Sequence, residues 1–462
     1  HADMMSLADV ESIRLDMERA AARRLQPHFI RLFFTQAFTR LGGRLAERER
    51  GRFEITHVPA LIRERDRQLG TGMPVLKRYD RVTFERHLVT VPGKPMAELV
   101  APGHPLFDAT LDLTVERHGP LLRQGGVLVA DAEDHVEPFV LVYLEHAIDD
   151  GQPITVSRRF QFVRITRDGN LTALDGAPYL DYRPAEDEEL KLIGSLLDEP
   201  WLRDSIEAKA VEHAIEHLAL EHLAQVRARV QLRIDKTEQK VRERLLKEVA
   251  YWDHRANELA DQEAAGKQPR MNAQAARDRA NEFEARLQRR LAELAKQRQL
   301  SPQRPVVVGA ALVLPGGFLA RLRGEVGVAP DQHAEARKRI ERLAVDAVLA
   351  AEQRLGRDPR EMPPNNPGYD IESRAGWGEL LFIEVKGRVA GAPTVTVTKT
   401  EILTGLNKPD DFILALVEVA PDDTTSVRYV RRPFTGQEDG LLGVASVSFE
   451  WDHFWEQGQE PS

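Results

Sequence analysis

The fold is decided by the stretch LFIEVK at residues 381–386, towards the C-terminal end of a 462-residue chain. Its apolar and β-branched residues predict a strand, and side chains along a strand alternate between the two faces of a sheet. Ile383 and Val385 therefore share the face that packs on a core. Glu384 and Lys386 share the other face, which fixes a carboxylate beside an ammonium group on a rigid element.

Asp370 lies upstream of this strand, directly after the turn-forming Pro367-Gly368-Tyr369. A loop is expected to enter a neighbouring strand at this point. The resulting pattern is Asp, thirteen residues, Glu, one residue, Lys. It brings two carboxylates and one ammonium group into the order that a metal-dependent hydrolytic site uses.

Phosphodiester hydrolysis explains these residue types. Two carboxylates can hold Mg²⁺ or Mn²⁺ through oxygen ligands. The ion orients and acidifies a water, and a neighbouring lysine stabilises the charge that develops. We therefore predict Asp370, Glu384 and Lys386 as catalytic residues and Asp370 and Glu384 as metal ligands. The alternative is a Glu–Lys neighbour pair on the surface of a strand.

A helix precedes this region, and Glu341 lies on the stripe beside its core face, next to Val345. We expect Glu341 to be half buried and to complete the metal site, and we prefer it to Glu352 as a ligand. The alternative is that Glu341 forms an ion pair with Arg337 or Lys338.

The sequence Thr398-Lys399-Thr400-Glu401 follows an alternating strand at 394–397. A threonine with a glutamate three positions later forms a capping box, which predicts a helix from about residue 399. Capping alone accounts for Thr398 and Glu401, whereas Lys399 is a candidate for contacting phosphate. The other candidates for nucleic-acid binding are Arg388, Arg286 and Arg290.

The length, net charge and cysteine content of the chain exclude several classes of protein. A chain of this length exceeds one ordinary core, which predicts about three domains. The net charge of −9 excludes a histone-like DNA binder, so nucleic-acid contacts must use local basic patches. Such patches occur at residues 40–52, 227–233 and 286–290. The absence of cysteine excludes disulfides and thiolate zinc sites.

Apolar runs are too short for a membrane helix, which needs roughly 18 residues. The start, His1-Ala2-Asp3-Met4-Met5, is unlike a signal peptide. We therefore expect a cytoplasmic protein. No P-loop is present, so we predict no ATPase motor in this chain.

Periodicity divides the chain into four regions and predicts a multidomain α/β fold. Residues 1–95 are predicted to be helical, with one helical stretch from 6 to 50. Residues 96–200 are predicted to form a small α+β module with an antiparallel sheet. Residues 201–302 show apolar positions at three- and four-residue spacing, broken at 266–269, which predicts a long antiparallel helical hairpin or coiled-coil arm. Residues 303–462 are predicted to form a mixed α/β domain.

Residues 335–420 resemble the NO VEIN C-terminal domain family, a branch of the restriction-endonuclease-like, PD-(D/E)XK superfamily. The segments that carry the resemblance are Pro367-Gly368-Tyr369-Asp370-Ile371, Phe382-Ile383-Glu384-Val385-Lys386-Gly387-Arg388 and Val397-Thr398-Lys399-Thr400-Glu401. The family usually has asparagine where this chain has Thr400. The resemblance implies a restriction-endonuclease-like fold and a nuclease-type metal site.

Other segments resemble the C-terminal half of bacterial Swi/Snf-type helicases, which are ATP-driven DNA translocases often found in antiphage defence clusters. These segments are Leu25-Gln26-Pro27-His28-Phe29-Ile30, Ile55-Thr56-His57-Val58-Pro59, His104-Pro105-Leu106-Phe107 and Tyr251-Trp252-Asp253-His254-Arg255. The resemblance implies DNA, an ATPase motor and other defence proteins as partners. The sequence thus predicts a Mg²⁺-dependent DNA endonuclease region of a helicase. The alternative is an inactive module that binds DNA or a partner.

Overall fold

The computed structural model describes residues 14–462, apart from 16, 20, 23–26, 71–72, 132, 134–136, 175, 204, 325–329, 364–365, 377 and 437–443. The chain forms two compact units. Unit 1 combines His1–Leu141, Thr166–Leu202 and Gly309–Ser462, whereas unit 2 combines Val142–Ile165 and Arg203–Val308. Among the described residues, no helix has the length and apolar character needed to cross a bilayer.

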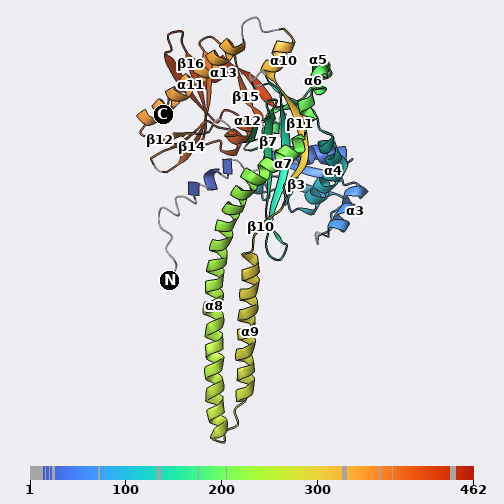
Figure 1. Cartoon of the computed structure of the whole chain (residues 1–462), viewed down its shortest axis with the longest axis vertical. Helices are drawn as coiled ribbons and strands as arrows, with labels where there is room; N and C mark the ends of the chain where they lie inside the picture. Colours follow the sequence, from blue (N-terminus) through green and yellow to red (C-terminus); the bar gives the residue numbers. More distant parts are fainter. Residues whose placement is uncertain are drawn as a thin grey trace. The chain divides into compact units, whose positions relative to one another are not determined.

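The first part of unit 1 is a small sheet covered by helices (Figure 1). The strands, in sheet order, are β1 (Arg44–Glu49), β2 (Arg52–His57), β3 (Tyr79–Thr83) and β4 (Glu98–Leu99). The helices are α2 (Pro27–Arg40), α3 (Ala60–Leu69), η1 (Arg86–Leu88) and α4 (Pro105–Gln124). Phe34, Phe38 and Phe107 form an aromatic core between them. The prediction of helix through residue 50 is wrong, because α2 ends before Gly42, whose φ is +92°, and β1 follows.

A second part of unit 1 is built on strand β11 (Val306–Pro315), which pairs in parallel with β5 (Val127–Ala130). The sequence predicted an antiparallel sheet within residues 96–200, and β5 does pair antiparallel with β9 (Arg183–Pro184), which lies on its other edge. The correction is that β11, expected in the domain at 303–462, joins this sheet as a parallel strand. The remaining elements are β8 (Leu171–Leu174), η2 (Pro178–Asp181), α5 (Asp187–Leu192), α6 (Gly194–Leu197), η3 (Pro200–Leu202) and α10 (Gly316–Leu322).

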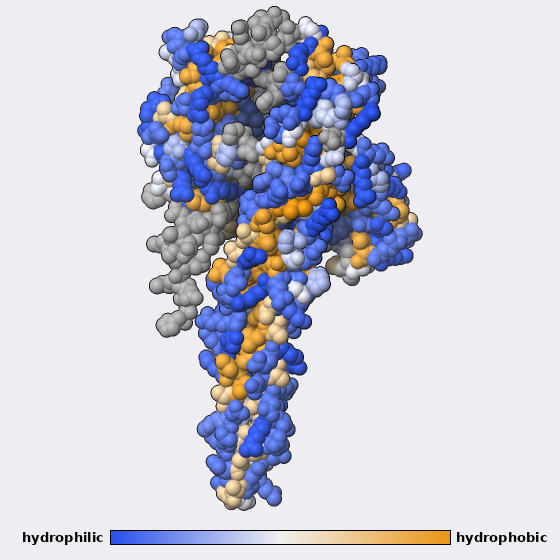
Figure 2. Space-filling view, in the orientation of Figure 1, coloured by the Kyte–Doolittle hydropathy of each residue, from blue (hydrophilic) through white to orange (hydrophobic). Residues whose placement is uncertain are grey.

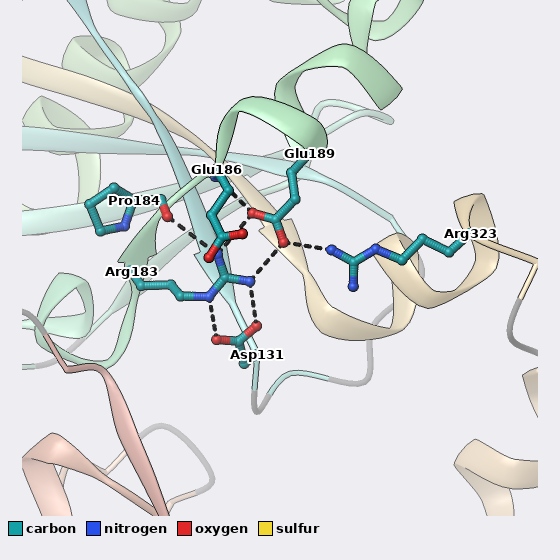
Figure 3. Close-up of polar contacts among 6 residues, drawn as sticks. All are labelled: Asp131, Arg183, Pro184, Glu186, Glu189 and Arg323. Carbon is teal, nitrogen blue, oxygen red and sulfur yellow. Dashed lines mark hydrogen bonds and ion pairs between the residues drawn. The ribbon is translucent and has the colours of Figure 1, made fainter.

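An ion cluster connects these short elements, and Figure 3 shows Arg183 between two carboxylates. Its guanidinium donates to Asp131 at 2.7 Å and to Glu189 at 2.7 Å, and Arg323 donates to the same Glu189 carboxylate at 2.8 Å. Glu189 is only 1% exposed. Its hydrogen bonds to Arg183 lower its pKa to about 2, so Glu189 is a charged and fully paired structural group.

Unit 2 is dominated by two long helices, α8 (Leu220–Ala264) and α9 (Ala273–Gln297), which lie side by side in Figure 1. Val226, Val230 and Leu294 pack together at one end, and Ala256 packs with Ala276 at the other, so the helices are antiparallel. Figure 2 shows an apolar band that follows the pair. The predicted break at 266–269 coincides with the turn between them. The remaining elements are β6 (Phe139–Asp149), β7 (Thr155–Thr166), α7 (Ile206–His213), the π-helical turn η4 (Ala214–Ala219) and β10 (Ser301–Pro302).

The C-terminal part of unit 1 is a mixed sheet in the order β12-β13-β14-β16-β17. Strands β14 and β16 are parallel, and the other pairs are antiparallel. The bounds are α11 (Pro330–Arg354), β12 (Asp358–Glu361), β13 (Ile371–Arg374), β14 (Leu380–Val389), β15 (Thr394–Thr398), α12 (Lys399–Asn407), β16 (Phe412–Val419), β17 (Thr425–Arg431), β18 (Ser446–Glu450) and α13 (Trp451–Gln457).

Both faces of this sheet are covered. Helix α11 packs on the face that carries Ile383 and Val385. The opposite face, which carries Phe382, packs against α12, α13 and the β15–β18 pair. A residue from far upstream also joins this part, because Arg19 forms an ion pair with Glu372 of β13 at 2.9 Å. Strand β14 is thus a central strand buried on both sides, and the surface alternative for Glu384 and Lys386 is wrong.

Candidate active site

Asp370 lies beside the segment of strand β14 that carries Glu384. Strand β13 pairs with β14 in the register Ile371↔Ile383, and Asp370 immediately precedes β13. The Asp370 backbone N–H donates to the Ile383 carbonyl at 2.9 Å. Its carboxylate accepts from the Val385 backbone N–H at 2.8 Å. The two carboxylates that the sequence predicted as a pair are therefore held on adjacent chain segments of one sheet.

The turn before Asp370 requires glycine at position 368. Gly368 has a φ of +89°, and a Cβ there would lie 2.1 Å from the Thr404 hydroxyl of α12. Tyr369, which follows, is 1% exposed and packs edge-on against Phe382 with ring centroids 4.9 Å apart. This close packing of the turn on α12 and β14 fixes where Asp370 enters the sheet.

Lys386 lies between two carboxylates. Its Nζ is 2.8 Å from Glu384 and 2.7 Å from Glu401. Glu401 also accepts from the Thr398 backbone N–H at 3.0 Å as part of the capping box that begins α12. Capping therefore accounts for only part of the role of Glu401, and the sequence analysis did not foresee its contact with Lys386.

Burial strengthens the electrostatics of this cluster. Glu384 is 4% exposed, and burial together with Asp370 and Glu401 raises its pKa well above the ordinary value. Burial also raises the pKa of Asp370 to about 6. Although burial opposes it, attraction to Glu384, Glu401 and Asp370 raises the pKa of Lys386, which stays protonated. The cluster therefore holds more carboxylate groups than its single ammonium group can balance.

Asp181 is a member of this cluster that was not predicted from the sequence. It lies at the end of the short turn η2, about two hundred residues upstream in the chain. Its carboxylate accepts from the Thr400 backbone N–H at 2.7 Å, at the start of α12. Burial raises its pKa to about 7, and the neighbouring Glu401 adds to this effect. Asp181 thus places a carboxyl group that titrates near neutral pH beside Glu401.

The two glutamates of α11 that were considered as metal ligands, Glu341 and Glu352, differ in burial. Glu341 is exposed on α11, so the expectation of a half-buried side chain is wrong. Its charge nevertheless raises the pKa of Asp370, which places it near the cluster. Glu352 is fully buried, where it accepts from Arg357 at 3.0 Å and from the Tyr429 hydroxyl at 2.8 Å. Glu352 therefore has a structural role.

The donor set suits a hard divalent cation. Across the described residues, no three His, Asp or Glu side chains are grouped as ligands of one ion. Asp370, just before β13, and Glu384 on β14 supply carboxylate oxygens, and Mg²⁺ commonly uses one or two carboxylates with waters and substrate phosphate. Burial first, and neighbouring carboxylates second, raise the pKa of both groups, and a bound cation would favour their charged forms. The residues present therefore fit Mg²⁺ or Mn²⁺.

The predicted nucleic-acid contacts are spread over both units. Lys399 is 8% exposed at the start of α12, and burial lowers its pKa. Arg388 is partly exposed near the end of β14. Arg286 and Arg290 are exposed on α9 of unit 2, where Arg290 pairs with Glu293 at 2.7 Å. The structure thus brings Lys399 close to the acidic cluster and places Arg286 and Arg290 on a different unit.

Sequence similarity to a known family covers this site. Residues 340–430 match the family model "Protein NO VEIN, C-terminal". The NO VEIN match runs from within α11 nearly to the end of β17 and includes Asp370, Glu384, Lys386 and Glu401. Asp181 lies outside it. No curated protein matches the chain. The family resemblance predicted from the residues is therefore supported for this segment.

Proposed function

We propose that the chain hydrolyses DNA phosphodiesters with Mg²⁺ through the cluster of Asp370, Glu384 and Lys386. The observation that carries the proposal is that Asp370 hydrogen-bonds to both neighbours of Glu384 on β14, Ile383 and Val385, with Lys386 on the same strand. The raised pKa values of both carboxylates and the NO VEIN match of the segment support it. A PD-(D/E)XK-type endonuclease is the class of enzyme that this residue set favours.

Each side chain has a defined task in this reaction. Asp370 and Glu384 would hold the ion through carboxylate oxygens. When bound, Mg²⁺ would supply positive charge and a polarised water. Lys386 stays protonated between Glu384 and Glu401, and it stabilises the negative charge that develops on the phosphate. Because the cluster is buried, each of these interactions is stronger than it would be in water.

A second function is favoured by one specific contact. Lys386 pairs with both Glu384 and Glu401, so the cluster partly neutralises itself without an ion. A self-neutralised cluster suits a catalytically inactive module that binds DNA or a partner protein. The two functions differ in whether Asp370 and Glu384 bind a divalent ion.

DNA cleavage by the full chain tests the proposal. Supercoiled, linear duplex and single-stranded DNA would be incubated with Mg²⁺, Mn²⁺ or EDTA. We expect cleavage that needs the ion and is lost in Asp370→Asn and Glu384→Gln. Asp346→Asn, which changes an exposed carboxylate of α11, is the matched control and should cleave normally. Equal cleavage by Asp370→Asn and the unaltered chain would overturn the assignment.

Calorimetric titration with Mn²⁺ separates the nuclease from the binding module. We expect binding by the unaltered chain and none by Glu384→Gln. Absence of binding at millimolar Mn²⁺, with and without DNA, would make the inactive module the correct function.

The wider setting is also part of the proposal. The segments that resemble Swi/Snf-type helicases support a chain that works with an ATPase motor and other antiphage defence proteins in the cytoplasm. In that setting the motor delivers DNA to the acidic cluster. Copurification of the chain with a DNA-dependent ATPase from its native cells is the expected result, and its absence would count against the association.

A further inference from the structure

Unit 2 contains a basic cavity that lies apart from the acidic cluster in the sequence and plays no part in the proposed hydrolysis. It has a volume of about 240 Å³, far above the roughly 15 Å³ that one water needs. It lies between strand β7 and the first turns of α8. The lining residues are Ser157, Arg158, Arg159, His222, Gln225, Val226 and Arg229.

One wall of the cavity is a face of strand β7, and the other is a face of helix α8. Ser157 and Arg159 are two residues apart on β7 and share one face of the strand. His222, Gln225 and Arg229 are three and four residues apart on α8 and share one face of the helix. Arg159 donates to the Gln225 side chain at 2.7 Å, which joins the two walls.

A chain of hydrogen bonds between neutral groups forms the floor of the cavity. Ser157 Oγ lies 2.8 Å from His222 Nε2, and His222 Nδ1 lies 3.2 Å from His146 Nδ1. His146 Nε2 lies 3.2 Å from the side-chain oxygen Oε1 of Gln161. One set of tautomers satisfies every link, with Ser157 donating to His222. Burial, together with repulsion from Arg159 and Arg229, lowers the pKa of His222 to about 4. His222 is therefore neutral at pH 7.

The arginines give the cavity an unbalanced positive charge. Arg158 is paired with Glu145 at 3.3 Å, but Arg159 contacts only the neutral Gln225 in the described part of the chain. Arg229 forms no ion pair with any described residue. Glu221 is the nearest acidic residue on α8, and it accepts from Gln225 at 2.9 Å. Arg159 and Arg229 line the same cavity as His222, and their charges disfavour a protonated imidazole there.

We propose that this cavity binds a phosphate group through Arg159 and Arg229. Guanidinium groups present several donors in a plane and bind phosphate oxygens in pairs, and a neutral floor adds no repulsion. The phosphate belongs either to a nucleic-acid backbone or to a free phosphate ester. The site does not depend on the acidic cluster, because it needs no divalent ion.

Titration with inorganic phosphate in the presence of EDTA tests the site in the full chain. We expect saturable binding by the unaltered chain. Arg229→Ala removes one charged pair of hydrogen-bond donors, so it should weaken phosphate binding at least about tenfold. Arg227→Ala is the matched control, because Arg227 is an exposed arginine on the same helix, two positions away and facing elsewhere. It should bind phosphate normally.

Competition identifies the source of the phosphate. A short DNA duplex that displaces inorganic phosphate, with weaker DNA binding in Arg229→Ala, indicates a nucleic-acid backbone. Displacement by a nucleoside monophosphate but not by DNA indicates a free ester. No saturable phosphate binding, or equal weakening in Arg227→Ala and Arg229→Ala, would overturn the proposal. Retention of phosphate binding in a cleavage-dead Asp370→Asn chain keeps this result separate from the proposed nuclease function.

Discussion

At the scale of single residues, Lys386 is the balancing charge of the acidic cluster. Replacing it by alanine leaves Glu384 and Glu401 buried without a cation, which destabilises the fold by about 3 kcal/mol. Thermal unfolding of Lys386→Ala in EDTA checks this, and Lys338→Ala, on the exposed face of α11, is the control. Added Mn²⁺ should restore part of the lost stability. No recovery with Mn²⁺ would contradict a metal site at Glu384.

Replacing Asp370 is expected to have the opposite effect on stability. Because its folded pKa is about 6 rather than 3.8, its ionisation disfavours the folded state. Stability contributed by the protonated form is present below pH 3.8 and is lost as pH rises through 6, about 3 kcal/mol in total. Asp370→Asn should therefore unfold at a higher temperature than the unaltered chain at pH 7.5 in EDTA. The difference in unfolding temperature between the two chains should shrink at pH 4. An Asp370→Asn variant that is less stable than the unaltered chain at pH 7.5 would contradict the idea that ionised Asp370 destabilises the fold.

That Asp370, Glu384 and Lys386 lie close together could be predicted from the sequence, because strand alternation and a short spacing are local properties. The sequence could not predict Asp181, whose role depends on a turn from a distant segment meeting the start of α12. Glu401 was assigned to capping alone, since nothing local shows that Lys386 reaches it. The prediction that Glu341 is half buried was wrong. Helical periodicity gives the direction in which a side chain points around the helix axis, but it does not show how far the sheet extends beneath the helix.

At the scale of elements, the turn at Gly368 makes a sharp prediction. Alanine there combines a strained φ with a Cβ against Thr404, which destabilises the chain by about 3 kcal/mol and displaces Asp370. Gly356→Ala is the matched control, because Gly356 also has a positive φ but nothing within 4 Å, and it should lose only about 1 kcal/mol. Urea unfolding measures both. Similar losses in the two variants would contradict the close packing.

The Glu189 cluster makes a pH-dependent prediction for α5 and β9. The pKa of Glu189 falls from 4.5 to about 2 on folding. The charged carboxylate therefore contributes about 3 kcal/mol to the stability of the folded state above pH 4.5, and this contribution is lost as pH falls through 2. Glu189→Gln should therefore be less stable than the unaltered chain at pH 7. The gap should narrow at pH 3 in urea unfolding, and a constant gap would show that the charge is not the cause.

Elements with strong local signals were predicted well, and pairing between distant elements was not. The helix expected at 104–122 is α4, and the strand expected at 306–314 is β11. The sequence missed the parallel pairing of β11 with β5, because the partners are far apart in the chain. It also missed β1, whose alternating Arg and Glu residues resemble a solvated helix face.

At the scale of the whole molecule, an acidic chain must bind DNA through restricted basic surfaces. If phosphate contacts dominate, affinity should fall at least about tenfold between 50 and 200 mM salt. Replacing Arg286 and Arg290 by alanine should lower the slope of log affinity against log salt by about two. Fluorescence anisotropy with labelled DNA measures both quantities, and Mn²⁺ binding should be unchanged. A salt-independent affinity would exclude this mode of binding.

The discontinuity of unit 1 has a consequence for synthesis in the cell. The Arg19–Glu372 pair joins residues 353 positions apart, and Asp181 meets α12 across 219 positions. Such distant contacts slow folding because a long loop must close first. While the ribosome is still producing the segment after residue 309, the earlier parts of unit 1 lack their partners. The nascent chain must therefore keep apolar surface uncovered until β13 and α12 emerge, and chaperones should bind it during that interval.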